Sequence, residues 1–310
     1  MILFAGIPSE PPLALAIAAA EVHHVRHLVL HQRHAPFIDM SLDVRDGAVT
    51  GALWVWERCV PLTDVSGVYA RVVDSANLPE TRPRIGGPPH VAERCAFLHA
   101  VLNELLEIAE CPVLNRAGAM ASNASKPYQL QRIVAAGFAV PDTLVTDDPD
   151  AVRHFACAHR RLIYKSASGV RSIVHELGPD RSDAALARLR NLPTQFQQYI
   201  DGTNVRVHVV GTDVFATEVR TNAVDYRYAH CDDEDVAMTA ITLPAAIADR
   251  CVDLSERLEL PFCGIDLKRA KDGEWYCFEV NPSPAYSYYQ EHTGQKIADA
   301  VVRYLSAGAP

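Results

Sequence analysis

The segment that most constrains this 310-residue chain is FCGIDLKRAKDGEWYCFEVNPSP, residues 262–284. Two runs with the composition and alternation of β-strands flank Asp272-Gly273, a dipeptide typical of two-residue hairpin turns. If these two residues form the turn, Lys271 pairs with Glu274 and the two strands continue from there without a break in register. The sequence therefore predicts a tight β-hairpin.

The predicted register brings two acids face to face. Asp266 lies directly opposite Glu279, where Cβ atoms are about 5 Å apart and like charges destabilise the sheet, so we expect positive charge beside them. Asn281 adds a carbonyl oxygen on the same face, opposite Gly264, which leaves room for a ligand. Such oxygen ligands suit Mg²⁺, which keeps waters and binds phosphate. The alternative is a solvent-exposed face on which Asp266 pairs with Lys268 or an arginine.

Two lysines are placed where phosphate would bind. The chain has few lysines among its 29 basic residues, and Lys126 stands just before a predicted helix whose Pro127 fits a first-turn position. A helix N-terminus attracts anions, and a lysine there adds a full charge. Lys165 ends the strand RLIYK before the small-residue loop SASGVRS. Each lysine alone fits a solvated surface position equally well; together with the acidic hairpin they predict phosphate contacts.

Charge, hydrophobicity and cysteine content exclude several classes of partner and location. The net charge is −9 and no block of basic residues occurs, which argues against nucleic acid or an anionic membrane as the main partner. No apolar run approaches the roughly 18 residues of a membrane helix, and no basic residue precedes the first apolar helix as in a signal peptide. The eight cysteines are scattered singly, as in a reduced compartment. We expect a cytoplasmic protein.

The order of predicted elements indicates an α/β (α+β) chain of three parts. Residues 1–115 begin with the strand ILFAG and a helix, and read as an α/β domain. Residues 116–194 alternate helix and strand, and residues 195–310 contain strands, a helix near 244–258, the hairpin and a final helix. Arg71 ends a strand of the first part, where open α/β sheets place ligands, and would grip a substrate carboxylate there.

Several of these motifs occur together in one known family. Lys126 before a helix, GFAVPDTLVT, Lys165 before its loop, FQQYIDGTNVRVHVVG and GIDL…FEVNPSP follow one another in that order. In this, residues 115–310 resemble the ATP-grasp carboxylate-amine ligases, in particular the branch of peptide-modifying glutamate ligases, glutathione synthetases and graspetide synthetases. The resemblance implies an ATP-grasp fold, with an N-terminal α/β pre-domain and two α+β subdomains that clasp the nucleotide.

The resemblance also implies roles for individual residues, carried over position by position. Residues expected to contact ATP are Lys126, Lys165, Ser168, Arg171, Gln198, Tyr199, Ile200, Asp201 and Asn204. Residues expected to hold Mg²⁺ between the phosphates are Asp266, Glu279 and Asn281. Arg206 is expected to steady the transferred phosphoryl group or the acyl phosphate. Arg220 and Arg227 are expected to face the acceptor or the phosphates, Arg220 as a catalytic residue and Arg227 as a substrate-binding one. For Arg220 and Arg227, surface ion pairs with acids such as Glu218 or Asp225 are the alternative.

The implied activity is ADP-forming ligation, in which ATP activates a carboxylate as an acyl phosphate and an amine then displaces phosphate. Small molecules or peptides would be the substrates, and a homodimer is expected from the family. Two alternatives stay open: a graspetide-type synthetase that links side chains of a ribosomal peptide, and a regulatory protein that binds Mg-ATP without ligation. A dinucleotide-dependent oxidoreductase is disfavoured because no GxGxxG follows the first strand.

Overall fold

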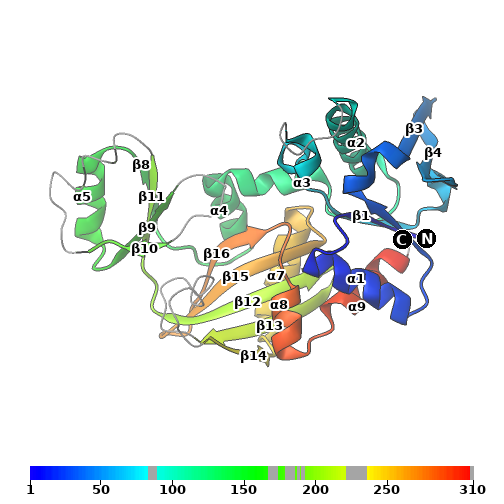
Figure 1. Ribbon diagram of the computed structural model, residues 1–310. Helices are drawn as coiled ribbons and strands as arrows, with labels where there is room; N and C mark the ends of the chain where they lie inside the picture. Colours follow the sequence, from blue (N-terminus) through cyan, green and yellow to red (C-terminus); the bar gives the residue numbers. More distant parts are fainter. Residues whose placement is uncertain are drawn as a thin grey trace.

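The computed structural model describes residues 1–82, 89–166, 174–178, 186, 189, 193–220 and 236–307. These residues form a mixed α/β structure with four sheets, as the sequence predicts. Figure 1 shows the N-terminal region at one end, a small sheet with one helix at the other end, and a larger sheet between them. Short 3₁₀ helices span Gln32–Phe37, Leu62–Asp64, Ser75–Asn77, Pro79–Thr81 and Ala121–Ala124.

The N-terminal region is built on a parallel sheet. Its strand order is β2-β1-β6-β7, with β1 at Ile2–Gly6, β2 at His27–His31, β6 at Gly67–Arg71 and β7 at Val113–Leu114. Every residue of β1 is buried, as expected for an inner parallel strand covered on both faces. Helix α1 (Pro11–Val22) contributes Leu13 and Ala16 to the core beside this strand.

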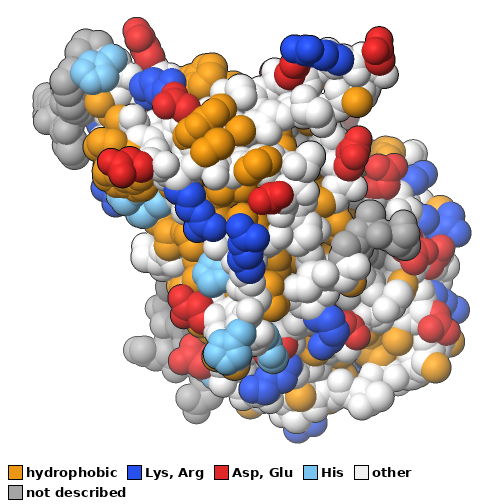
Figure 2. Space-filling view, turned by 90° about the vertical axis from the view of Figure 1, so that its right-hand side faces the viewer, with side chains coloured by type: hydrophobic (Ala, Val, Ile, Leu, Met, Phe, Trp, Pro, Cys, Tyr) orange, Lys and Arg blue, Asp and Glu red, His pale blue; other side chains and the backbone are white. Residues whose placement is uncertain are grey.

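A second, antiparallel sheet lies beside the first and shares a core with helix α2 (Pro89–Ile108). Its strands are β3 (Ile38–Arg45), β4 (Ala48–Val55) and β5 (Arg58–Pro61). The face of the molecule in Figure 2 carries acidic and basic side chains interspersed, without an extended area of one sign. No helix in the described part of the chain combines the length and apolar character needed to cross a bilayer.

The small sheet at the end of the molecule, called the central sheet here because it is central in chain order, has the strand order β10-β9-β11-β8. Its strands are β8 (Thr143–Thr146), β9 (Leu162–Ser166), β10 (His175–Glu176) and β11 (Thr194–Gln198), and α5 (Pro149–Ala158) packs on it through Val152. Helices α3 (Ala117–Met120) and α4 (Lys126–Ala135) precede this sheet in the chain. The predicted boundary between residues 194 and 195 falls at the start of β11, which pairs with β8 and β9 along its length. The division into parts stays a prediction.

The larger C-terminal sheet positions the predicted hairpin. Its order is β14-β13-β12-β15-β16, with β12 at Gly202–Val210, β13 at Asp213–Arg220, β14 at Ala237–Ile241, β15 at Phe262–Ala270 and β16 at Trp275–Asn281. The described residues of this region also form the helices α7 (Ala245–Arg257), α8 (Ser287–Thr293) and α9 (Ile297–Ser306).

The two faces of this sheet have different chemistry. Apolar side chains at alternate positions, such as Val207 and Ile265, share one core with residues of α4 and α7. The intervening positions therefore face the other way, and they include Arg206, Asp266 and Lys268. Because the period of a strand is two residues, the apolar core on one face fixes which polar side chains appear on the other.

The hairpin turn differs from the prediction. The amide of Ala270 donates to the carbonyl of Glu274, and Gly273, at φ +92°, donates to the carbonyl of Ala270. This is a three-residue loop with glycine in the left-handed region, so the predicted pairing of Lys271 with Glu274 is wrong.

A β-bulge restores the predicted register further along. Leu267 pairs with Cys277 and Asp266 with Glu279, so Phe278 is the extra residue of β16. The predicted pairs of Asp266 with Glu279 and of Gly264 with Asn281 are confirmed. The bulge matters for the site because it brings both Phe278 and Glu279 to the wall of one pocket.

Asn115 joins the N-terminal region to both strands of the hairpin. Its buried side chain donates from Nδ2 to the carbonyls of Phe262 (2.5 Å) and Pro282 (2.6 Å). Its Oδ1 accepts from the amide of Phe262 at 3.1 Å. One amide side chain thus satisfies backbone groups at the ends of β15 and β16 that would otherwise be buried without partners.

We predict that Asn115→Ala lowers the free energy of unfolding by about 2–4 kcal/mol, because it leaves several buried backbone groups without hydrogen bonds. Urea denaturation followed by circular dichroism measures this change. Asn77→Ala, at an exposed position, is the matched control and should change stability by less than about 0.5 kcal/mol. Equal effects of the two substitutions would contradict the role assigned to Asn115.

Candidate active site

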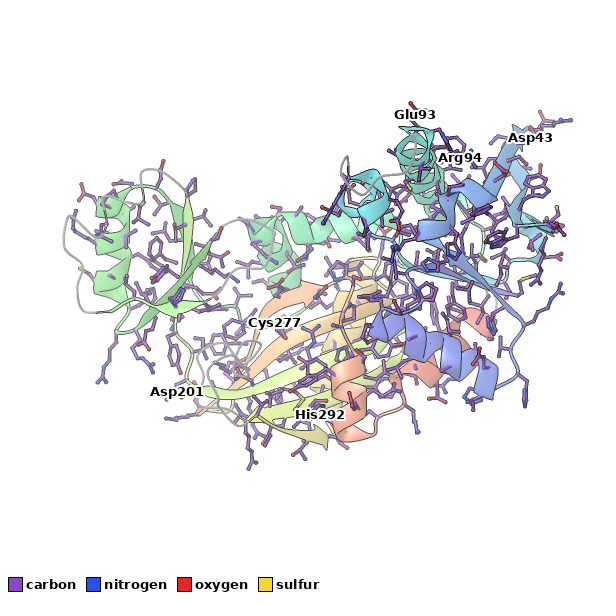
Figure 3. The ribbon with its side chains drawn as sticks, viewed as in Figure 1. Asp43, Glu93, Arg94, Asp201, Cys277 and His292 are labelled. Atoms are coloured by element: carbon purple, nitrogen blue, oxygen red, sulfur yellow. The ribbon has the colours of Figure 1, made fainter. Side chains whose placement is uncertain are left out.

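A pocket lies between the central sheet and the polar face of the large sheet. It brings together six of the predicted site residues, namely Lys165, Tyr199, Ile200, Asn204, Asp266 and Glu279. The remaining lining residues are Ile163, Val174, Gln197, Val205, Leu267, Lys268 and Phe278. Figure 3 shows Cys277 within the large sheet and Asp201 where the chain passes from the central sheet into β12.

The two opposed carboxylates each have a cationic partner. Arg206 donates from Nη1 to Oδ1 of Asp266 at 2.8 Å, and Lys126 donates from Nζ to Oε1 of Glu279 at 2.6 Å. All four side chains are at most 22% exposed. The positive charge expected beside the acids is therefore present in the protein itself, and the arginine partner foreseen as the alternative for Asp266 is Arg206.

Arg206 occupies the space that Gly264 leaves. A Cβ atom at Gly264 would lie 2.0 Å from Nη2 of Arg206, so the room expected there for a ligand holds the guanidinium instead. Only 6% of the Arg206 side chain is exposed, and its Cζ atom is 5.8 Å from the centre of the Tyr289 ring. Burial, and then the charge of Arg206, hold the pKa of the neighbouring His208 well below its usual value, so this ring is neutral.

Lys126 begins helix α4, close to the acidic pair. Besides Glu279, its Nζ donates to Oδ1 of Asn123 at 2.8 Å, and 17% of the side chain is exposed. Lys165 lies in β9, on the opposite wall of the pocket. The two predicted phosphate lysines thus approach the site from different elements, the start of a helix and a strand of the central sheet.

The segment that joins the two sheets has few backbone groups left for a ligand. The amides of Gln198 and Tyr199 donate to the carbonyls of Asp142 and Arg161, and the Arg161 guanidinium stacks 3.6 Å above the Tyr199 ring. The amide of Ile200 makes no hydrogen bond to the described residues. Of these three predicted contacts, Ile200 therefore offers the amide best able to bind a base edge.

Two predicted ligand contacts have partners within the protein. Asp201 accepts from Nζ of Lys271 at 2.5 Å near the hairpin turn, a hydrogen bond that lowers the pKa of its carboxyl. Oδ1 of Asn281 accepts from the amide of Ser283 at 2.9 Å, which orients this oxygen at the end of β16. An amide oxygen has two lone pairs, so this hydrogen bond leaves Asn281 able to coordinate a cation.

The donor set fits a hard divalent cation that keeps part of its water shell. Asp266 and Glu279 supply carboxylates from paired positions, and Asn281 supplies an amide oxygen from the next row of the same sheet. The described residues contain no group of three or more His, Cys, Asp or Glu side chains arranged to hold a metal. An ion here would therefore need further oxygen ligands, as Mg²⁺ commonly obtains from phosphate and water.

The predicted arginines are not all at the pocket. Arg220 is 78% exposed and bonds Glu218 at 2.6 Å, the ion pair foreseen as its alternative. Arg71 makes a bidentate contact with Glu10 and donates to the carbonyl of Pro284, which ties β6 to the loop after β16. Their roles toward substrate stay predictions. Three further predicted residues lie outside the described part of the chain: Ser168, Arg171 and Arg227.

Some residues that line the pocket were not predicted as site residues from the sequence. Gln197 lines the pocket, whereas the predicted Gln198 accepts a hydrogen bond from Asp142. Phe278 reaches the pocket because of the bulge, which nothing in the sequence indicated. Lys268 was detectable, since it lies two residues beyond Asp266 on the same face; its ammonium is partly buried, which lowers its pKa.

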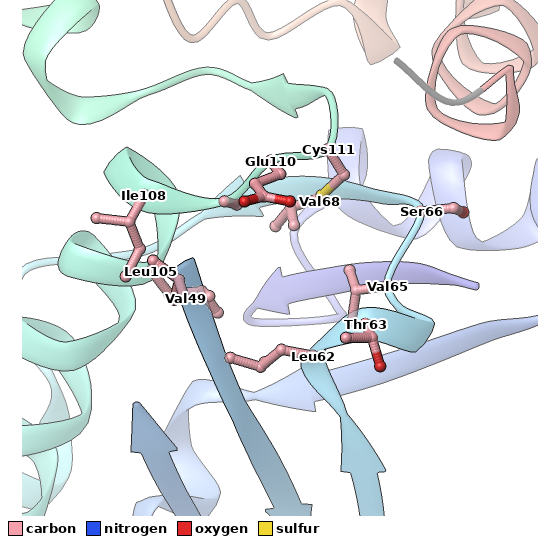
Figure 4. A pocket seen from close by; sticks show the side chains of 11 residues that line it. Val49, Leu62, Thr63, Val65, Ser66, Val68, Leu105, Ile108, Glu110 and Cys111 are labelled. Carbon is pink, nitrogen blue, oxygen red and sulfur yellow. The ribbon is translucent and has the colours of Figure 1, made fainter. Parts of the chain in front are cut away.

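Another pocket lies in the N-terminal region (Figure 4). It is lined mainly by apolar side chains, among them Val49, Leu62, Leu105 and Ile108. None of the predicted site residues lines it. Since catalysis of group transfer needs converging charged and hydrogen-bonding groups, the pocket between the two sheets is the candidate active site.

Comparison with protein families supports this assignment. Residues 132–305 match the family model of the RimK-like ATP-grasp domain, which is more than half of the chain. The chain belongs to the RimK-like ATP-grasp family. The match includes Lys165 and the whole β12–β16 sheet, whereas Lys126 lies just before it.

Among proteins similar in sequence, the beta-citrylglutamate synthase B of Danio rerio is 26% identical over 215 residues, which are 66% of this chain and 53% of that protein. The human protein of the same name is 24% identical. A probable alpha-L-glutamate ligase of Mannheimia succiniciproducens is 28% identical over 203 residues, 63% of this chain and 67% of the ligase. The chain thus spans about half the length of the synthases it matches.

Solved structures share the fold over nearly the whole chain. A RiPP-associated ATP-grasp ligase of Chryseobacterium gregarium, in complex with ADP and a leader and core peptide, has a TM-score of 0.80 at 21% identity and covers 100% of this chain and 97% of its own. The macrocyclase MdnC of Microcystis aeruginosa has a TM-score of 0.80 at 18% identity, with 99% of each chain covered. The common fold therefore includes the N-terminal region, confirming the ATP-grasp architecture.

We predict that Gly264→Ala folds but moves the Arg206 guanidinium off Asp266, because the new methyl group would take its place and the side-chain end can shift. A crystal structure of the variant should show the contact between Nη1 of Arg206 and Oδ1 of Asp266 lengthened beyond 4 Å. Gly178→Ala is the control, since none of the described residues beyond its chain neighbours comes within 4 Å of the position of its Cβ. An unchanged contact in Gly264→Ala would contradict the packing described here.

Proposed function

We propose that this protein is an ATP-dependent, ADP-forming carboxylate-amine ligase. The observation that carries the proposal is the pocket in which Lys165, Asp266 and Glu279 meet between two sheets, with Lys126 and Arg206 bonded to the two acids. Membership of the RimK-like ATP-grasp family supports it, as do relatives named as glutamate ligases and synthases of glutamate-containing compounds.

In the proposed complex, the nucleotide lies along the pocket from the linker, residues 198–201 between the two sheets, to the acidic pair of Asp266 and Glu279. The amide of Ile200 and the neighbouring Tyr199 contact the base, and Asn204 lies near the sugar. Lys126 and Lys165 hold the phosphates, as compact charges that need no fixed orientation. Gln198 and Asp201 belong to the same linker, and Ser168 and Arg171 to the segment that follows β9 in the sequence, which lies outside the described residues.

Asp266, Glu279 and Asn281 would hold Mg²⁺ in this complex. The ion would supply positive charge to the phosphates as they accumulate negative charge. Lys126 and Arg206, which neutralise the acids in the structure, stand next to the same place. They can therefore contribute charge to the phosphates without moving far from their present positions.

The proposed reaction has two steps. An oxygen of the substrate carboxylate attacks the γ-phosphorus of ATP. The bond between this phosphorus and the oxygen that bridges to the β-phosphate breaks, and the products are ADP and an acyl phosphate. The amine then attacks the acyl carbon, the bond from this carbon to the phosphate oxygen breaks, and the nitrogen gives up its proton to the departing phosphate or to water. Arg206 stabilises the transferred phosphoryl group, and no side chain acts as a nucleophile. Arg71, Arg220 and Arg227 are proposed to bind substrate or phosphate.

Two sets of similar proteins support the proposed substrate class. Small acids and amino acids fit the synthases similar in sequence, and peptides fit the ligases similar in fold. A cytoplasmic location, where ATP is supplied, and a homodimer complete the proposal. Incubation with Mg-ATP and separate pools of amino acids, dicarboxylates and peptides should release ADP with at least one pool. Nucleotide binding without ADP release from any pool would favour a regulatory protein.

We predict that Glu279→Gln lowers the rate of ADP release at least 100-fold, because one charged metal ligand is lost from the acidic pair. Coupled detection of ADP gives the rate, and circular dichroism shows that the variant is folded. The matched control is Glu274→Gln, at an exposed position beside the turn of the same hairpin, which should retain the wild-type rate. Undiminished turnover by Glu279→Gln would refute the proposed role of the acidic pair.

A further inference from the structure

Lys268 is a pocket residue that makes no ion pair with a carboxylate in the described part of the chain. It lies in β15, and its Nζ donates to the carbonyl of Ile200 at 3.2 Å. Within the described residues this is its only hydrogen bond, and no carboxylate lies within 4.0 Å of it. Lys126 and Lys271, by contrast, each make an ion pair. An ammonium group has three N–H donors, so two remain for a ligand.

Aromatic rings hold the Lys268 ammonium at the pocket wall. Its Nζ lies 5.4 Å from the centre of the Tyr199 ring and 5.7 Å from that of Phe278. Both rings line the same pocket. Ring faces attract a cation but offer it no lone pair, so they position the ammonium without satisfying its remaining donors.

The sheet register places Lys268 between the two ends of the proposed nucleotide site. Asn204 of β12 is its direct neighbour across the strands, and the next row on this face contains Arg206 and Asp266. Alternate rows of a strand are about 6.8 Å apart. The paired residues Asn204 and Lys268 lie beside the linker, because Lys268 bonds the carbonyl of Ile200. The next pair on this face, further from the linker, contains Asp266, which is paired in turn with Glu279. A nucleotide that runs from linker to acids would have its sugar over the first of these rows.

We propose that Lys268 donates a hydrogen bond to a ribose hydroxyl of the bound nucleotide and thereby makes the site selective for ribonucleotides over deoxyribonucleotides. This inference rests on the proposed function, because it requires the nucleotide to occupy the pocket between the sheets. A hydroxyl oxygen would accept from one of the two remaining donors of this partly buried ammonium. Its removal from the ligand would leave that donor unsatisfied, which is how polar sites reject analogues that lack one group.

Isothermal titration of the full chain with Mg-ADP, Mg-2′-deoxy-ADP and Mg-3′-deoxy-ADP tests this inference. Wild-type protein should bind ADP at least ten-fold more tightly than one of the two deoxy compounds. In Lys268→Met, which keeps the apolar stem, affinity for ADP should fall about ten-fold and the preference should disappear. Lys268→Arg, which keeps a charged donor, should retain a preference of the same sign. Lys296→Met, at an exposed lysine, should behave as wild type.

Outcomes that contradict the role of Lys268 differ from the outcome that contradicts the proposed ligase function. The inference is wrong if wild-type protein binds all three compounds equally, if Lys268→Met keeps the wild-type preference, or if this variant weakens all three compounds by one factor. Circular dichroism identifies a variant that does not fold, in which case Lys268→Gln serves for the same comparison. Absence of ADP binding by folded wild-type protein would instead contradict the proposed ligase function.

Discussion

The opposition of Asp266 and Glu279 across β15 and β16 is the constraint on which the rest of the site depends. Two carboxylates at paired positions repel each other, and the protein compensates with one cation for each acid. Arg206 comes from β12, the neighbouring strand, and Lys126 from the start of α4. The charge balance of the hairpin therefore fixes how a strand and a helix must approach it.

The apolar side of the same sheet makes this arrangement rigid. Alternate residues of β12 and β15 are buried against α4 and α7, so a shift of one residue would move the charged side chains into that core. Gly264 adds a steric condition, because only a residue without Cβ leaves space for the Arg206 guanidinium. Packing on one face thus specifies which side chains the other face presents.

How much of the site could be predicted from sequence depended on the range of the interaction involved. The acidic pair followed from local alternation, and the register near Asp266 was correct although the turn was not. The three-residue loop and the bulge at Phe278 offset each other, and neither has a distinct sequence signal. Contacts between distant segments, such as Arg206 over Gly264 or Glu10 bound to Arg71, depend on tertiary packing and could not be derived from local patterns.

The central claim is that a divalent ion and a nucleotide share the pocket between the two sheets, with the acidic pair holding the ion. Anomalous diffraction from crystals grown with Mn²⁺ and a non-hydrolysable ATP analogue tests it most directly. The account predicts a manganese peak within about 2.5 Å of carboxylate oxygens of both Asp266 and Glu279, with the nucleotide extending toward Ile200. A nucleotide bound in the N-terminal pocket, or an ion that contacts neither carboxylate, would contradict it.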